Sequence, residues 1–90
     1  MQKRIAIQIS GKVQGVFFRA STKEYADQLG VKGFVRNEPN GDVYVEAEGV
    51  EETLRSFEAW CKQGPRLARV DRVDVKAMEW IGFTDFVISR

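Results

Sequence analysis

The stretch VKGFVRNEPNGDVYVEAEG, residues 31–49, predicts the hairpin around which the fold is built. Its middle, PNG at 39–41, consists of residue types that favour tight turns. Apolar side chains occupy every second position after the turn, at Val43, Val45 and Ala47. This period of two is typical of a strand with one buried face. The stretch therefore predicts paired strands near 31–37 and 42–48.

The residues before the hairpin predict a strand and then a helix. The first segment alternates between apolar and small or polar side chains, with Ile5, Ile7 and Ile9 on one face. Farther along, Ser21 and Glu24 have the spacing of a capping box, in which the two side chains cap the start of a helix. With Gly30 as its stop, the helix is expected from about Thr22 to Leu29.

The residues after the hairpin predict a second helix and two further strands. Apolar residues spaced four, three and four positions apart form a helical stripe: Val50, Leu54, Phe57 and Cys61. The pair Gly64-Pro65 ends this helix. Alternation then returns at 73–77 and in a short last strand at 86–88. Because Val70 is out of phase with Val73, a kink or bulge is expected between them.

The order strand, helix, strand, strand, helix, strand is the split βαβ, or ferredoxin-like, arrangement. We therefore predict an α+β protein whose antiparallel sheet, with a short C-terminal strand, carries two helices on one face. Ninety residues make one domain, 1–90. This fold hosts many activities, so function must be argued from particular residues.

Composition excludes several classes of function. The net charge of +1 lacks the basic excess that is usual in nucleic-acid binders. No apolar run approaches the ~20 residues of a membrane span. The chain has no histidine, which excludes histidine bases and histidine zinc sites, and its single cysteine, Cys61, excludes an internal disulfide. A cytosolic protein is the simplest interpretation.

The segment GKVQGVFFR, residues 11–19, predicts a site for a small anion. It joins the first strand to the first helix, where free main-chain N–H groups and the helix dipole favour negative charge. Arg19 adds a planar cation that can bind two phosphate oxygens. The spacing of Gly11 and Gly15 fits neither of the common glycine-rich nucleotide motifs. Spacing alone leaves open that Arg19 is an ordinary surface residue and that Asn37 only begins the hairpin turn.

Two segments resemble the signatures of the acylphosphatase family. ISGKVQGVFFR (9–19) is similar to the first signature, and GFVRNEPNGDVYVEAEG (33–49) is similar to the second. The resemblance implies a hydrolase that cleaves the carboxyl–phosphate bond of acyl phosphates without metal or cofactor. Arg19 would bind the phosphate and Asn37 would hold the attacking water. The phosphate would lie in a cradle of main-chain amides from Gln14, Gly15, Val16, Phe17, Phe18 and Arg19.

We expect a monomer that acts on a small-molecule acyl phosphate and releases inorganic phosphate, and the net charge and the lack of a long apolar run indicate that neither nucleic acid nor membrane is a partner. Two other functions remain open. KGFV, residues 32–35, faintly resembles an RNA-binding stretch, although it falls on the second strand rather than the third. A domain that binds phosphate without turnover is the other alternative.

Overall fold

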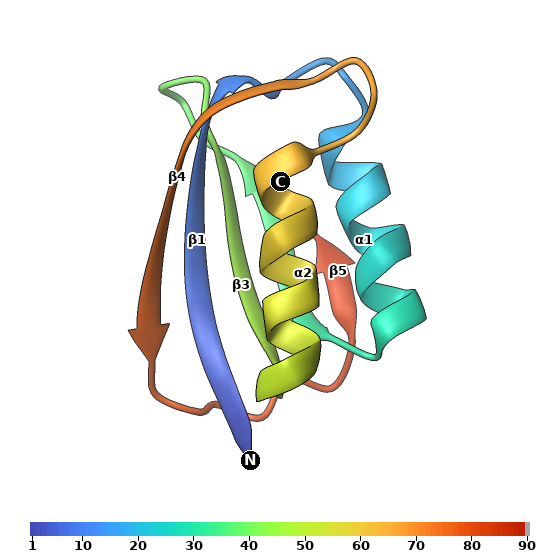
Figure 1. Ribbon diagram of the computed structural model, residues 1–90, viewed down its shortest axis with the longest axis vertical. Helices are drawn as coiled ribbons and strands as arrows, with labels where there is room; N and C mark the ends of the chain where they lie inside the picture. The colour runs from blue at the N-terminus through green and yellow to red at the C-terminus, as the bar shows by residue number, and fades with distance from the viewer. Residues whose placement is uncertain (90) are drawn as a thin grey trace.

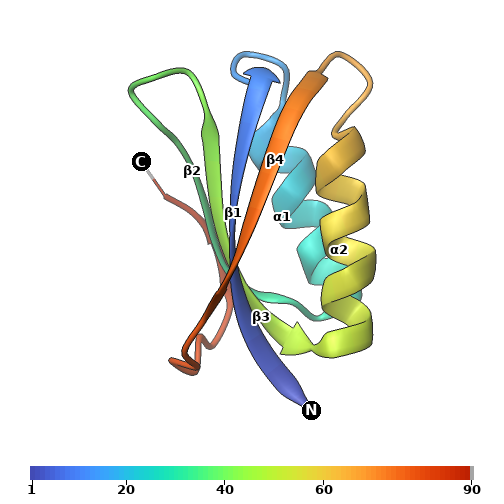
Figure 2. The ribbon, with the colours of Figure 1, turned by 60° about the vertical axis from the view of Figure 1, so that its left-hand side comes forward.

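The computed structural model describes residues 1–89. Two helices, α1 and α2, cover one face of a five-stranded sheet whose strand order is β4-β1-β3-β2-β5 (Figures 1 and 2). This arrangement confirms the predicted ferredoxin-like fold. The elements are β1 (Gln2–Lys12), α1 (Phe18–Leu29), β2 (Lys32–Asn37), β3 (Val43–Val50), α2 (Glu51–Gln63), β4 (Arg69–Met78) and β5 (Phe86–Ile88).

The last strand makes the sheet mixed instead of wholly antiparallel. β5 pairs with β2 in parallel, while β1, β2, β3 and β4 form antiparallel pairs. The chain reverses between β4 and β5, and β4 itself runs opposite to β2, so β5 must run in the same direction as β2. Two main-chain hydrogen bonds, one at each end, hold β5 against β2. Gly33 N donates to Asp85 O (2.8 Å), and Ser89 N donates to Val35 O (2.8 Å).

The core lies between the sheet and the two helices. The predicted stripes of β1 and β3 supply fully buried Ile7, Ile9, Val43, Val45 and Ala47, and α2 adds buried Leu54, Phe57 and Cys61. Periodicity therefore assigned the buried faces of β1, β3 and α2 correctly, except that Val50 is the last residue of β3 and is exposed instead of belonging to the stripe of α2. Burial also raises the pKa of the Cys61 thiol, so this cysteine is a small apolar core residue.

The first helix begins four residues earlier than the capping pattern predicts. α1 starts at Phe18, its N-cap is Phe17, and no side chain caps it, so the capping box of Ser21 and Glu24 is wrong. The burial of the Phe18 ring outweighs the local signal, because this side chain is only 2% exposed. The hydroxyl of Thr22 donates to Phe18 O (2.7 Å) inside the first turn. Arg19 therefore lies within the first turn of α1.

The expected irregularity near Val70 is confirmed as a shift in register between β1 and β4. Ser10 pairs with Arg72, but Gly11 pairs with Val70. At Gly11 the backbone has φ +134°, and a Cβ there would lie 2.2 Å from Arg69 O. Glycine is therefore required for the close approach of the two strands just before the chain enters the loop to α1.

A buried carboxylate holds the connection between β4 and β5. Glu48, 1% exposed, accepts hydrogen bonds from the main-chain N–H groups of Ile81 (2.6 Å), Gly82 (3.0 Å) and Phe83 (2.6 Å). Burial alone would raise the pKa of Glu48, but these three donors and nearby Arg4 outweigh it and hold the pKa below its usual value.

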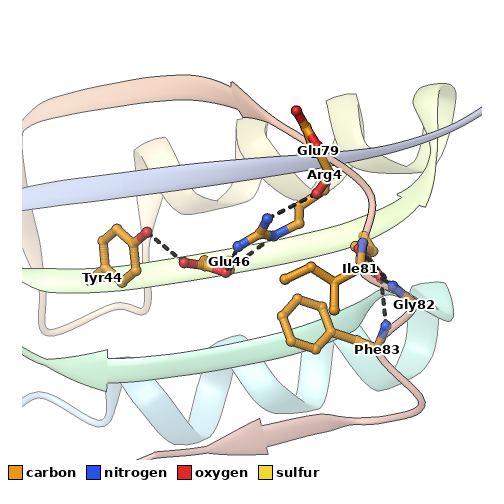
Figure 3. A network of polar contacts seen from close by, with 8 residues as sticks. Arg4, Tyr44, Glu46, Glu79, Ile81, Gly82 and Phe83 are labelled. Carbon is orange, nitrogen blue, oxygen red and sulfur yellow. Dashed lines mark hydrogen bonds and ion pairs between the residues drawn. The ribbon is translucent and has the colours of Figure 1, made fainter.

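Figure 3 shows the surrounding polar network. The guanidinium of Arg4 binds Glu46 and donates to Glu79 O (2.9 Å), and the hydroxyl of Tyr44 donates to the same Glu46 carboxylate (2.7 Å). Burial, followed by the adjacent Glu46, raises the pKa of Tyr44 to about 12. These contacts and the Glu48 bonds hold the connection that leads to β5.

Replacing Glu48 by glutamine is expected to lower the free energy of unfolding at pH 7 by about 2–4 kcal/mol. An amide offers one acceptor oxygen to three N–H donors and turns its own N–H₂ group toward them. Urea denaturation measures the loss. Because the folded pKa is lowered, the contribution of the carboxylate is present above its ordinary pKa of 4.5 and is lost as the pH falls through the folded value.

The difference between wild type and Glu48→Gln should therefore shrink below about pH 4.5. Exposed Glu52 is the matched control, and Glu52→Gln should change stability by less than about 0.5 kcal/mol. A Glu48→Gln protein as stable as wild type at pH 7 would show that the three amide bonds contribute no net stability.

Candidate active site

Three buried apolar side chains anchor the loop from β1 to α1. Val13, Val16 and Phe18 are at most 4% exposed. All three belong to the core cluster, the set of buried apolar side chains that pack between the sheet and the helices. Gly15 and Phe17 lie between them, and both have left-handed backbones, with φ of 74° and 66°. The apolar residues of the motif therefore anchor the loop, and its turns keep Gly15 and Phe17 at the surface.

The side chain of Gln14 ties this loop to the turn between β2 and β3. Its amide nitrogen donates to the main-chain oxygens of Glu38 (2.8 Å) and Asp42 (2.9 Å). Gln8 donates to the Asp42 carboxylate (2.7 Å), which lowers the pKa of that carboxyl and keeps the turn fixed. The spacing of residues in the sequence gave no sign of the hydrogen bonds from Gln14. These bonds bring the loop beside the end of β2, where Asn37 lies.

Main-chain donors of the loop and the first helical turn are left available. In α1 the first main-chain bond runs from Ser21 N to Phe17 O (3.0 Å). Within residues 1–89, the N–H groups of residues 14–20 donate to no other protein group. The start of a helix carries such unpaired N–H groups and the positive end of the helix dipole, so this end of α1 favours an anion.

A cavity of about 730 Å³ joins the loop, the start of α1 and the edge of the sheet. Its lining residues are Val13, Gly15, Phe17, Phe18, Arg19, Ala20, Asn37 and Ile88. Five residues of the predicted site are thus brought together: Gly15, Phe17, Phe18, Arg19 and Asn37. Gln14 and Val16 do not line the cavity, and a role for their amides stays a prediction.

Arg19 and Asn37 reach this cavity from different elements. Arg19 comes from the first turn of α1, and Asn37 is the last residue of β2, paired with Val43. Across residues 1–89, neither side chain has a hydrogen bond or an ion pair to another protein group. A planar cation and a neutral amide can therefore both bind a ligand in one cavity.

Among residues 1–89, no side chain that lines the cavity exchanges protons near neutral pH. This part of the lining has no carboxylate, thiol or phenol, and Arg19 is its one charged side chain. The described part of the chain also has no group of three or more His, Cys, Asp or Glu side chains that could hold a metal ion. Binding and orientation by fixed donors are what this arrangement can supply.

Sequence reasoning missed three features of the site. Ile88 of β5 and Ala20 of α1 line the cavity, and the side chain of Gln14 ties the loop. The position of Ile88 depends on the pairing of β5 with β2, where Ile88 lies opposite Val35. No local pattern encodes that pairing, so only the folded structure reveals it.

Comparison with known proteins agrees with this geometry. The family model "Acylphosphatase" matches residues 5–88. The chain is 46% identical over 89 residues to an acylphosphatase of Methylococcus capsulatus, covering 98% of this chain and 97% of that protein. Two solved acylphosphatases superimpose with a TM-score of 0.94. The acylphosphatase from Coxiella burnetii is 34% identical, and the superposition covers 98% of this chain and 93% of that one. The acylphosphatase from Bacillus subtilis is 33% identical, and the superposition covers both chains fully. The chain belongs to the acylphosphatase family.

Proposed function

We propose that the chain hydrolyses the carboxyl–phosphate bond of acyl phosphates, giving a carboxylate and inorganic phosphate. The observation that carries the proposal is one cavity lined by the start of α1, by Arg19 and by Asn37, in which none of the described lining residues is acidic. Membership of the acylphosphatase family supports the same activity.

The phosphoryl group binds to the amides of residues 14–19 and to the guanidinium of Arg19. Phosphoryl transfer passes through a loose transition state whose charge lies on the peripheral oxygens, so positioning and electrostatic stabilisation supply most of the catalysis. The unpaired N–H groups and the guanidinium are donors of this kind. They are held by buried Val13, Val16 and Phe18, so little reorganisation is needed when charge develops.

The side-chain amide of Asn37 orients the attacking water. The water oxygen forms the new bond to phosphorus while the bond to the acyl oxygen breaks, and the carboxylate leaves with that electron pair. The proton of the water passes to a phosphate oxygen, so no histidine or carboxylate base is needed. Asn37 has no protein partner within residues 1–89, which leaves its amide available for this contact.

The leaving group explains why the site needs no general acid. A carboxylate is the base of an acid with a pKa near ~4, and it departs without being protonated. An alkoxide leaving from a phosphate monoester is far more basic and needs a proton donor. General acid catalysis is typically worth about 10²–10⁴-fold, and the cavity-lining residues that the structure describes offer no group to supply it.

The proposal also covers the setting of the enzyme: a single-domain, cytoplasmic monomer that acts on a small molecule without cofactor, metal, nucleic acid or membrane. Over residues 1–89, the structure has no helix with the length and apolar character that crossing a bilayer requires.

The test compares benzoyl phosphate with methyl phosphate, each in the presence of EDTA. Wild type should hydrolyse benzoyl phosphate at the same rate with and without EDTA. The rate on methyl phosphate should be lower by at least about 10²–10⁴-fold, because the alkoxide receives no proton. Comparable rates on the two substrates, or loss of activity with EDTA, would contradict the proposed chemistry.

A further inference from the structure

Two exposed apolar side chains flank the cavity that holds Arg19 and Asn37. Phe17 is 73% exposed and Ile88 is 40% exposed, and both line the cavity. They come from elements far apart in sequence, the loop before α1 and the last strand β5. The proposed mechanism uses only the main chain of Phe17 and does not use Ile88.

Packing does not explain the ring of Phe17. The core cluster does not include it, and within residues 1–89 it forms no aromatic pair, whereas Phe18 packs against Trp60 with ring centroids 5.7 Å apart. Among residues 1–89, Phe17 is the only residue other than glycine with a positive φ. A left-handed backbone is disfavoured for a bulky side chain, and such strain persists mainly at functional sites.

Ile88 is placed at the cavity by the register of β5. It lies opposite buried Val35 of β2, and it shares the helix-facing side of the sheet with buried Phe86, since alternate residues of a strand point to one face. Its neighbour Val87 has similar exposure, 44%, but lies on the other face and does not line the cavity. β5 therefore presents one apolar side chain to the site.

The size and charge of the cavity agree with a ligand larger than phosphate. About 730 Å³ is within the range of sites that bind whole small molecules, roughly 300–1,000 Å³. Among the described residues of the lining, the polar side chains are Arg19 and Asn37, and the proposed mechanism uses both at the phosphate end. The other described side chains that line the cavity are apolar.

We propose that Phe17 and Ile88 form a subsite for the acyl group, which selects acyl phosphates with an aromatic or bulky apolar acyl group over small ones such as acetyl phosphate. This proposal rests on the proposed function. With the phosphoryl group at the start of α1, the acyl group of the substrate lies against these two exposed side chains of the cavity lining. Contact with the ring and the branched side chain then favours acyl groups that have apolar surface to bury.

The test is the ratio of kcat/KM for benzoyl phosphate to kcat/KM for acetyl phosphate. Both substrates have the same phosphoryl group, so any change in the amide cradle affects both terms of the ratio. Phe17→Gly and Ile88→Ala should each lower the ratio about three- to tenfold, the effect of losing one aromatic or apolar contact. Phe17→Tyr retains the ring and should keep the ratio of wild type, and Val87→Ala is the matched control on β5.

Each outcome supports or overturns the subsite. If both Phe17→Gly and Ile88→Ala keep the wild-type ratio, the acyl subsite is wrong while the proposed function stands. If wild type hydrolyses neither substrate, the proposed function is wrong. Urea denaturation checks folding, and Phe17→Gly should unfold at the same urea concentration as wild type or a higher one, because glycine adopts the left-handed backbone freely. Phe17→Asn, which also tolerates this backbone, should give the same lowered ratio.

Discussion

Replacing Arg19 by alanine should lower kcat/KM for benzoyl phosphate by about 10³-fold or more, the loss expected when a charged donor is removed from a phosphoryl-transfer site. Of the described residues that line the cavity, Arg19 is the only one with a charged side chain, so none of the others can replace it. The affinity for inorganic phosphate, measured as a competitive inhibitor, should fall in the same variant. Steady-state hydrolysis of benzoyl phosphate measures both effects.

Two further variants separate the role of Arg19 from general effects of charge. Arg19→Lys keeps the charge but loses the planar fork, and should recover only part of the activity. Arg55→Ala, which removes an exposed arginine of α2 paired with Glu51, should leave kcat/KM unchanged. Because Arg19 has no protein partner within residues 1–89, Arg19→Ala should unfold at the urea concentration of wild type. A loss of activity below about threefold would remove Arg19 from the site, since that is about 0.7 kcal/mol.

Replacing Asn37 by alanine should lower kcat by about 10²–10³-fold, with phosphate affinity unchanged within about threefold. In the proposed mechanism Asn37 holds the water and not the phosphoryl group, so its loss affects the chemical step and not binding. Alanine keeps the main-chain pairing of position 37 with Val43 and leaves the loop tie of Gln14 intact. The pair of measurements is kcat on benzoyl phosphate and the inhibition constant of inorganic phosphate.

The two variants thus give opposite patterns. Arg19→Ala loses binding and turnover together, and Asn37→Ala loses turnover alone. Asn37→Asp is an isosteric check, because a carboxylate beside the phosphoryl group should weaken phosphate binding by like-charge repulsion. If Asn37→Ala turned over benzoyl phosphate at the rate of wild type, the attacking water would have to be held elsewhere.

Periodicity predicted most of the fold because burial follows it directly. Alternation in β1 and β3 identified Ile7, Ile9, Val43, Val45 and Ala47, which are fully buried, and three members of the α2 stripe are buried as well. The fourth member, Val50, was assigned wrongly, because it ends β3 and is 44% exposed. Arg19 and Asn37, eighteen positions apart in the sequence, could be linked only through the family signatures, because no local pattern says that the two meet. In the structure they line one cavity.

The features that sequence missed depend on long-range contacts. The capping signal of Ser21 and Glu24 was overruled by burial of Phe18, which starts α1 earlier. The parallel pairing of β5, and with it the place of Ile88, depends on a connection held by the Glu48 carboxylate. The tie from Gln14 joins residues at least twenty-four positions apart. Single-residue propensities contain no information about such contacts.

The central claim is that the main-chain N–H groups at the start of α1 hold the phosphoryl group beside Asn37. Titration of the ¹⁵N-labelled protein with inorganic phosphate, followed through its amide resonances, tests this most directly. Saturable shifts should be largest for the amides of residues 14–19 and for the side-chain N–H₂ of Asn37, at the concentration at which phosphate inhibits benzoyl phosphate hydrolysis. If phosphate inhibited the enzyme while these resonances stayed in place and others moved, the phosphoryl group would bind elsewhere and the account would be wrong.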